Sequence, residues 1–315
     1  MKILAVDDDS EFLQIFESTL SNLGYSNITT AESADEALKK ITAAEFAFDC
    51  FILDVQMPGM DGIQLCETIR NMPEYDRTPI VMNTAMSDKA HIDRAFVAGA
   101  TDYLTKPINE VEIGTRLGVL HSLVRERIRS QHAIEHEGVD ILAPSYRFTD
   151  LIPMRRDTGS TEYTTLENYL KTLGVFRAYS TKVIGLHVEN GLQIFEEAGA
   201  SIFGEVMVDL ATCISDCLKI KNPMISYAGK GDFICLFSRV EVVDSVKIHT
   251  ELRKCIAQFA FVYDELNVRL PQICVGSAIA CKSRHIKSPL KLLEEAVLEA
   301  RFAATLRHAR VELCI

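Results

Sequence analysis

Short apolar runs alternate with amphipathic stretches throughout the first 125 residues, and this alternation restricts the folds open to the chain. The apolar runs have the length and flanking turn residues of β-strands, and the stretches between them place apolar residues at helical spacing. Strands are predicted at KILAV, NITT, CFILD, PIVMN and TDYLT, and helices at about residues 10–23, 33–43, 62–70 and 88–98 and from Asn109 onward. Five strand–helix units predict a parallel sheet with helices on both faces.

The notable polar residues of this region stand at the predicted carboxyl ends of the strands. Asp7 and Asp8 follow the first strand and Asp54 ends the third, while Thr84 and Lys106 follow the fourth and the fifth. These ends meet at one edge of a parallel sheet, so we expect the side chains to lie together. Crowded carboxylates repel one another, which favours a hard cation such as Mg²⁺ that prefers oxygen ligands. The sequence therefore predicts a Mg²⁺ site in which Asp54 can attack a phosphoryl donor.

Each of these residues also has an ordinary structural explanation. Asp7 and Asp8 could cap the first helix, Thr84 could stand in a turn, and Tyr103 could be a core aromatic residue. Such explanations would have to hold at every position at once, and this favours the phosphoacceptor hypothesis.

Four separated motifs carry a specific resemblance to a known family. They are VDDD at residues 6–9, LDVQMPGMDG at 53–62, NTA at 83–85 and YLTKP at 103–107. In these motifs and their spacing, residues 1–123 resemble the receiver domain of bacterial response regulators. The resemblance implies a flavodoxin-like (βα)5 domain, a phosphoprotein that acts in the phosphorelay of a two-component system.

The resemblance implies a role for each residue of the site. Asp54 is the phosphoacceptor, and its donor is a sensor histidine kinase or a phosphotransfer protein. The cofactor is Mg²⁺, held by Asp7, Asp8, Asp54 and the backbone carbonyl of Gln56. Lys106 stabilises the phosphoryl group and precedes a proline, Pro107, at the position where the family has a cis peptide bond.

The resemblance also implies a switch. Thr84 and Tyr103 would relay phosphorylation to the face formed by the fourth helix, fifth strand and fifth helix. The fifth helix runs on from Glu110 to about His136, so a changed face could act through it. We expect this helical linker, within residues 124–153, either to pair with a second copy in a homodimer or to serve as a solvated spacer. Pro144 and Pro153 mark the loop that ends it.

A second pattern of strands and helices follows the linker. Helices are predicted at TTLENYLKTLGVF, residues 191–219, VDSVKIHTELRKCIAQF and the closing SPLKLLEEAVLEARFAATLRH, and strands at KVIGLHV, MISYAGKGDFICLF and PQICVGSAIA. This order predicts an α+β domain whose antiparallel sheet carries helices on one face. Residues 154–315 resemble the GGDEF domain of diguanylate cyclases, a nucleotide-cyclase-like fold with a ferredoxin-like core, and GKGDF stands where the signature hairpin is expected.

Most residues that a cyclase needs for metal and nucleotide binding differ in this chain. His187 and Gly231 stand at metal-ligand positions, Phe195 and Gly204 at guanine-reading positions, and Leu192 and Lys230 at phosphate-binding positions. Asp232 is the one acid that remains there. We therefore expect a pseudoenzyme, a GGDEF-like output domain without catalytic activity that contacts an unknown downstream protein. The alternative is a divergent diguanylate cyclase, or a domain that binds a nucleotide or cyclic di-GMP.

Charge and composition argue against other classes of protein. The first 125 residues carry 20 acidic and 10 basic residues and the remainder 24 and 23, so the first region would repel nucleic acid. The second region lacks a helix-turn-helix pattern. No apolar run approaches the length of a membrane span, and KILAV begins the chain without an export signal. Nine cysteines without a C-x-x-C pair fit reduced thiols in the cytoplasm.

Two pairs of residues stand four positions apart in predicted helices. Cys213 and Cys217 form one pair, and His132 and His136 in the linker form the other. This spacing can bind a metal, but neither pair has further ligands nearby in the sequence. Cysteines at helical spacing are more often core residues, and this is what we expect of the first pair.

Overall fold

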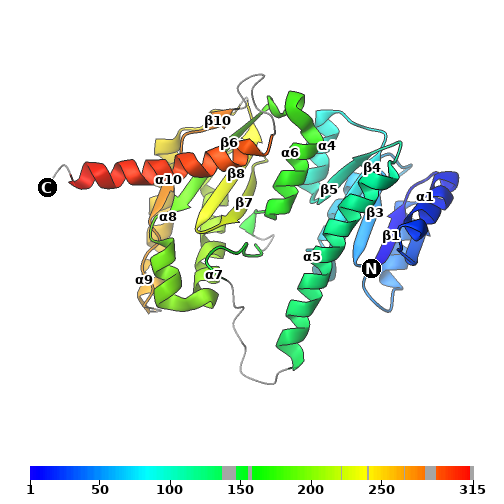
Figure 1. The fold of residues 1–315 in the computed structure, drawn as a ribbon, viewed down its shortest axis with the longest axis horizontal. Helices are drawn as coiled ribbons and strands as arrows, with labels where there is room; N and C mark the ends of the chain where they lie inside the picture. Colours follow the sequence, from blue (N-terminus) through cyan, green and yellow to red (C-terminus); the bar gives the residue numbers. More distant parts are fainter. Residues whose placement is uncertain are drawn as a thin grey trace. The chain divides into compact units, whose positions relative to one another are not determined.

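The computed structural model of the protein describes residues 1–136, 147–154, 158–220, 222–239, 241–265, 267–280 and 289–312 (Figure 1). The chain forms two compact units, Met1–Ile141 and Leu142–Ile315, and the division falls inside the predicted linker. In the second unit the ring centroid of Phe148 lies 5.8 Å from that of Phe195 and 5.6 Å from that of Phe203. The second unit therefore includes residues that precede its predicted start at residue 154. Pro144 and the side chains of His132 and His136 lie outside the described part of the chain.

The first unit contains the predicted five-stranded parallel sheet. Its strands are β1 (Lys2–Val6), β2 (Asn27–Ala31), β3 (Cys50–Leu53), β4 (Ile80–Thr84) and β5 (Asp102–Thr105). Its helices are α1 (Ser10–Asn22), α2 (Ala34–Thr42), α3 (Gly62–Arg70), α4 (Lys89–Ala98) and α5 (Glu110–His136), with a 3₁₀ turn η1 (Pro73–Tyr75). The strand order is β2-β1-β3-β4-β5, and every pairing is parallel. The flavodoxin-like fold expected from the sequence is thereby confirmed for this unit.

Helices cover both faces of the sheet. On one face, α1 and α5 pack against alternate strand residues in a core cluster that includes Ile3, Ile52, Phe16 and Leu117. Right-handed crossovers place α2, α3 and α4 on the opposite face, toward which the intervening strand residues point. The carboxyl ends of β1 and β3, neighbours in this order, are thus held side by side by a core on each face of the sheet.

Asp9 is the residue that caps α1. Its side chain accepts a hydrogen bond from the backbone N–H of Phe12 at 3.0 Å. The capping role that could have explained Asp7 and Asp8 is therefore wrong for both residues. Asp7 and Asp8 remain in the turn after β1, where the sequence analysis expected a functional site.

Gly62 begins α3 in direct contact with the backbone of Asp54. A Cβ atom at this position would lie 1.8 Å from the Asp54 carbonyl oxygen, closer than non-bonded atoms approach. The backbone N–H of Gly62 donates a hydrogen bond to the carbonyl of Val55 at 3.0 Å. The second glycine of the MPGMDG motif, Gly62, is therefore required by the close approach of α3 to the loop that carries Asp54.

The second unit is built on an antiparallel sheet. Its strands are β6 (Thr181–Val188), β7 (Met224–Gly229), β8 (Asp232–Ser238), β9 (Ile273–Val275) and β10 (Ile279–Ala280). Its helices are α6 (Tyr163–Ala178), α7 (Gly191–Cys217), α8 (Ser245–Gln258), α9 (Ala260–Glu265) and α10 (Lys291–Glu312). The strand order is β10-β6-β8-β7, and β9 also pairs with β6. The predicted hairpin is β7–β8, and every pairing of the named strands is antiparallel.

Helices lie on both faces of this second sheet, which corrects the prediction of a single covered face. Ile184 and Leu186 of β6 belong to a core cluster with residues of α7 and α8. Gly185 points the other way, where a Cβ atom would lie 2.0 Å from the carbonyl oxygen of Ala296 in α10. Glycine at this strand position lets α10 approach the sheet backbone closely, which the sequence pattern did not reveal.

By length and composition, α7 is the one helix within the described residues that could cross a membrane. The prediction that no apolar run approaches that length does not hold for it. Gly199 interrupts the helix with φ 83° and ψ 170°, and Phe203, Met207 and Leu210 are part of the core cluster of the second unit. Packing inside the unit accounts for the apolar composition of α7.

Replacing Gly62 with alanine is expected to destabilise the first unit by about 3 kcal/mol, because the backbone at Asp54 must move to admit the methyl group. Hydrogen exchange of the β1 and β3 amides would measure this loss. Gly118 is the matched control, since it is exposed on α5 and a Cβ atom there meets nothing within 4 Å. Gly118→Ala is expected to stabilise the helix by about 0.5–1 kcal/mol. Equal effects of the two substitutions would contradict this account.

Candidate functional site

Three carboxylates gather at the carboxyl end of the first sheet. One oxygen atom from each of Asp7, Asp8 and Asp54 lies within 4.8 Å of the others. Asp7 and Asp54 are buried and Asp8 is exposed, so the cluster opens to solvent on one side. The structure thus brings together the three acids that the sequence analysis assigned to the Mg²⁺ site.

Lys106 neutralises part of this negative charge. Its Nζ atom lies 2.6 Å from Asp7 Oδ2 and 3.2 Å from Asp54 Oδ2. The backbone N–H of Lys106 donates to the carbonyl of Thr84 at 2.9 Å, which joins the ends of β4 and β5. The peptide bond to Pro107 is cis, as the resemblance implied. The ammonium group also lies 4.2 Å from the ring centroid of Phe12, a contact that the sequence analysis missed.

Burial and charge pairing oppose one another at Asp7 and Lys106. Burial raises the pKa of Asp7 above the usual aspartate value, although the hydrogen bonds from Lys106 and the Asp9 backbone act in the opposite direction. Burial would lower the pKa of Lys106, but its hydrogen bond to Asp7 and the charges of Asp54 and Asp7 outweigh this effect and raise it. The lysine is therefore fully charged at neutral pH.

The oxygen donors of the cluster fit a magnesium ion. Asp54 Oδ1 is buried and has no hydrogen-bond partner within the described structure. An anionic oxygen in such a position is costly unless a cation or a new donor approaches it. The set is all oxygen and carries two negative charges beyond the lysine already paired, which suits a hard divalent cation.

Thr84 and Tyr103 both contact the backbone of Met86. Thr84 ends β4 fully buried, and its hydroxyl accepts a hydrogen bond from the Met86 N–H at 3.3 Å. The ring of Tyr103 is buried, and its hydroxyl donates to the Met86 carbonyl at 2.6 Å. Met86 therefore connects the two predicted switch residues, and no feature of its side chain pointed to this role in the sequence.

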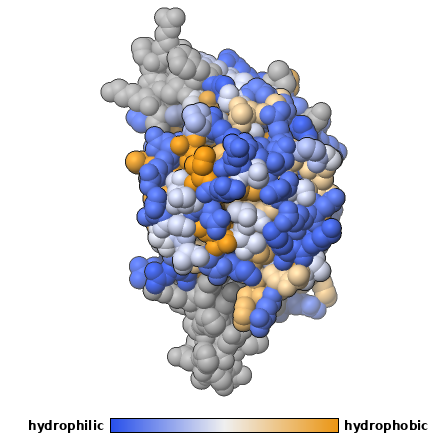
Figure 2. All heavy atoms as spheres, turned by 90° about the vertical axis from the view of Figure 1, so that its right-hand side faces the viewer, coloured by the Kyte–Doolittle hydropathy of each residue, from blue (hydrophilic) through white to orange (hydrophobic). Residues whose placement is uncertain are grey.

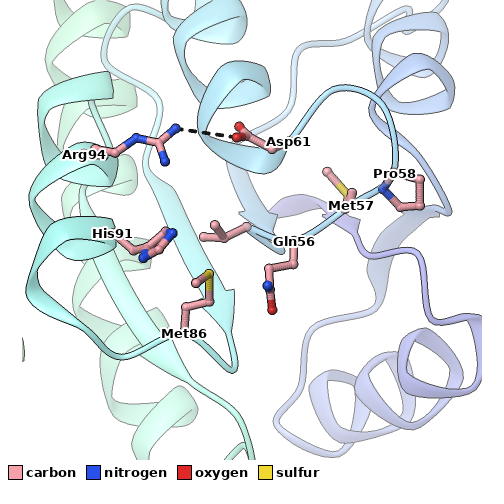
Figure 3. Close-up of a pocket in the computed structure, with 8 residues that line it drawn as sticks. Gln56, Met57, Pro58, Asp61, Met86, His91 and Arg94 are labelled. Atoms are coloured by element: carbon pink, nitrogen blue, oxygen red, sulfur yellow. Dashed lines mark ion pairs between the residues drawn. The ribbon is translucent and has the colours of Figure 1, made fainter.

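Gln56 lines a pocket of about 430 Å³ together with its neighbours Met57 and Pro58 (Figure 3). The loop after β3 lines one side, and His91 and Arg94 project from α4 on the other. Arg94 Nη2 lies 3.6 Å from Asp61 Oδ2 across the top of the pocket, and Asp61 itself caps α3. The ligand role of the Gln56 carbonyl stays a prediction.

In the second unit, the acid that remains at the expected metal site, Asp232, is paired with side chains of the protein. His187 lies opposite Asp232 in the β6–β8 register, and its Nδ1 atom is 2.8 Å from Asp232 Oδ1. Arg301, on α10, donates hydrogen bonds to both oxygens of the same carboxylate. Asp232 is only 2% exposed, so both oxygens of the remaining acid are occupied inside the protein. Arg301 lies 69 residues from Asp232 in the chain, so no local sequence pattern indicates this pairing.

Two of the other positions compared with a cyclase, Phe195 and Lys230, also have structural roles. Phe195 packs edge-on against Phe203 at 5.4 Å between ring centroids. Lys230 adopts φ 56° between Gly229 and Gly231, and its backbone N–H donates to the Phe148 carbonyl at 3.0 Å. These contacts build the turn of the β7–β8 hairpin and the aromatic cluster near it.

Comparison with known proteins identifies the first unit. The model of the response regulator receiver domain matches residues 3–117. Over 115 residues the chain is 40% identical to the transcriptional regulatory protein YvrH of Bacillus subtilis. The matched segment covers 36% of this chain and 46% of YvrH. Over 110 residues the chain is 34% identical to the signal transduction histidine-protein kinase BarA of Escherichia coli. That segment covers 35% of this chain and 12% of BarA. The chain thus spans less than half the length of either relative.

The solved structure of the Vibrio cholerae chemotaxis protein CheY4 is 35% identical, covers 38% of this chain and 97% of that chain, and has a TM-score of 0.36. The receiver match lies entirely within the first unit. The first unit is a response regulator receiver domain, and receiver domains bind Mg²⁺ at an acidic pocket such as the one formed by Asp7, Asp8 and Asp54. The matches leave the resemblance of the second unit to GGDEF domains without support.

The raised pKa of Asp7 predicts a pH effect on the receiver in the presence of a chelator. Between its native pKa and the ordinary value of about 3.9, folded Asp7 holds a proton that the unfolded chain has released. The free energy of unfolding therefore rises as the pH falls through this window. The substitution Asp7→Asn removes this pH-dependent contribution. Lys106 stays charged throughout, because its own pKa is raised.

Urea unfolding of the wild type and Asp7→Asn at about pH 7 and about pH 4 would measure this contribution, since this interval extends down to the ordinary aspartate value. We expect the stability of the wild type relative to the variant to rise on acidification. Asp76→Asn, an exposed change of the same charge, should show no such trend. A difference that stays constant for Asp7→Asn would show that burial does not control this carboxyl.

Proposed function

We propose that the chain is a response regulator whose receiver domain takes a phosphoryl group on Asp54 and signals through a second unit without catalytic activity. The observation that carries the proposal is the buried Asp54 carboxylate, with one oxygen beside Lys106 and the other without a partner. The donor would be a sensor histidine kinase or a phosphotransfer protein. Such a regulator would work in the cytoplasm and contact an unknown downstream protein.

The residues of the site divide the phosphotransfer chemistry among them. A carboxylate oxygen of Asp54 attacks the phosphorus atom, the bond from phosphorus to the donor histidine nitrogen breaks, and an aspartyl phosphate forms. Lys106 moves its contact from the Asp54 oxygen to the incoming phosphoryl oxygens and offsets their charge. Mg²⁺, when held by Asp7, Asp8, Asp54 and the Gln56 carbonyl, supplies further neutralisation of that charge.

The contacts of Met86 suggest how the phosphoryl group is relayed. A phosphoryl oxygen near β4 would compete for the Thr84 hydroxyl, which now accepts the Met86 N–H. A shift of the Met86 backbone would in turn change the hydrogen bond from Tyr103, whose strand precedes α5. We propose that this change alters pairing through α4, β5 and α5 and favours a homodimer.

The pairing of Asp232 supports an inactive second unit. A cyclase needs free carboxylates for two divalent cations, whereas His187 and Arg301 occupy both oxygens of this acid. Breaking a buried pair leaves an uncompensated charge, which costs about 3–5 kcal/mol. A cation would have to displace both partners to reach Asp232. The unit would then serve as a surface for protein contacts.

Acetyl phosphate with Mg²⁺ is expected to add one phosphoryl group to the intact protein at Asp54. Intact-mass and peptide mass spectrometry would locate it, and light scattering of the same sample would report a dimer. Asp54→Asn should abolish the modification, whereas Asp76→Asn, at an exposed turn, should leave it unchanged. Phosphorylation elsewhere, or none, would exclude Asp54 as the acceptor. A mass that stays monomeric after phosphorylation would reject the dimer alone.

A second candidate function is nucleotide binding by the second unit. A pocket of about 600 Å³ lies beside the end of β6 and the start of α7, lined by Glu189, Asn190, Gln193, Glu196, Arg269 and neighbouring residues. Asn190 fixes one wall, since its side chain binds the Leu270 carbonyl at 2.9 Å and the Gln272 N–H at 2.8 Å. The two acids in the lining, Glu189 and Glu196, outnumber its one basic residue, Arg269, and disfavour a phosphate group, so we rank this candidate second.

Calorimetry with GTP and with cyclic di-GMP, each with Mg²⁺, is expected to show no binding to the full chain. Asp232→Glu provides a matched comparison, since it restores the length of the acid expected in a cyclase. Binding of either nucleotide by the wild type would favour the second candidate. GTP turnover by the wild type would overturn the assignment of a pseudoenzyme.

A further inference from the structure

Three cysteines of the second unit converge between two helices. Cys213 and Cys217 lie one turn apart on α7, as their spacing predicted. The structure adds Cys255, from α8, which faces both of them. The sequence could not indicate this third thiol, because it stands 42 residues after Cys213.

The thiols of Cys213 and Cys255 are close enough to bond. Their Sγ atoms lie 2.9 Å apart, with the Cys255 thiol donating. A disulfide needs about 2.05 Å between the sulfur atoms, so an approach of about 0.9 Å would complete one. Cys217 also shares a side-chain hydrogen bond with Cys255, which makes it a second possible partner.

Exposure separates Cys213 from the other two residues. Cys213 is buried, whereas Cys217 and Cys255 are half-buried. Burial raises the pKa of Cys213, and it raises that of Cys217 to about 11, so both remain thiols at neutral pH. A soluble oxidant can reach both Cys217 and Cys255, and of these two Cys255 is the one bonded to both other thiols, so we expect the reaction to begin at Cys255.

Buried cysteines often serve only as small apolar side chains. Cys235 fits that description, because it is fully buried within the strand β8 and belongs to the core cluster. The cluster of Cys213, Cys217 and Cys255 differs, since it presents three thiols to one another and two of them reach the surface. Alanine or valine side chains would fill the space between α7 and α8 equally well, so packing alone does not require thiols here.

We propose that Cys255 is a site of reversible oxidation by peroxides, which joins α8 to α7 through a disulfide with Cys213 or Cys217. The Cys255 sulfur attacks one peroxide oxygen, the O–O bond breaks, and a sulfenic acid and one water form. The sulfur of the neighbouring thiol then attacks the Cys255 sulfur, and the sulfenic oxygen leaves as a second water with that thiol's proton. Two thiols lose two electrons to one peroxide, and a thiol reductant reverses the bond.

The third thiol, Cys217, allows a second reaction, thiol–disulfide exchange, after the first disulfide forms. A disulfide between Cys213 and Cys255 leaves Cys217 beside Cys255, where its sulfur can attack and exchange partners. The link would therefore distribute between both α7 cysteines. In either form it fixes α8 to α7, two helices on the same face of the second sheet.

The test uses the full chain, reduced and then treated with hydrogen peroxide. Intact mass spectrometry under non-reducing conditions should show the loss of two hydrogen atoms, and peptide mapping should find Cys255 joined to Cys213 or Cys217. A thiol reductant should restore the original mass. Thermal unfolding of the oxidised protein should shift upward, since the bond restricts the unfolded chain.

Cys255→Ser should abolish the link, and Cys66→Ser, in the first unit, should leave it intact. The peptide map of the wild type decides the matter even if a variant folds poorly. Oxidation of other cysteines while Cys255 stays unlinked would overturn the proposal. So would a link between Cys213 and Cys217 that forms equally well in Cys255→Ser.

Discussion

The receiver site depends on one ammonium group held between two buried carboxylates. Lys106 Nζ lies within hydrogen-bonding distance of both Asp7 and Asp54, which come from different strands. Without it, two negative charges would face one another in a buried place, at a cost of several kcal/mol. The lysine offsets only part of the charge, and Asp54 Oδ1 stays unpaired. Stability is thus given up at the carboxylate that we propose as the phosphoacceptor.

Most of the receiver site could be predicted from the sequence because its residues follow strands. A parallel sheet brings the carboxyl ends of its strands to one edge, so Asp7, Asp54 and Lys106 had to lie near each other once the strands were recognised. What remained hidden depends on backbone contacts. Met86 acts through its N–H and carbonyl groups, and Gly62 through the absence of a Cβ atom. Neither contact leaves a mark in polarity or periodicity.

The second unit shows where sequence reasoning reaches its limit. Its strands and helices were expected nearly where they lie, but the contacts that decide its chemistry join distant segments. Asp232 is paired by Arg301 from the last helix, and Cys255 meets Cys213 across a helix interface. Gly185 lets α10 pack closely on the second sheet, so a helix covers the face that was predicted to carry none. Such partners are set by tertiary packing, which local pattern does not encode.

The length of α5 bears on the relay that we propose for the receiver domain. Ile113 and Leu117 anchor the first turns of α5 in the receiver core, while its backbone continues to His136 without interruption. At about 1.5 Å per residue, its 27 residues span about 40 Å. A helix is stiff over this length, so a small tilt at the anchored turns becomes a displacement of several ångströms at the other end. If the proposed relay remakes the hydrogen bond of Tyr103, the helix would amplify that small movement along its length.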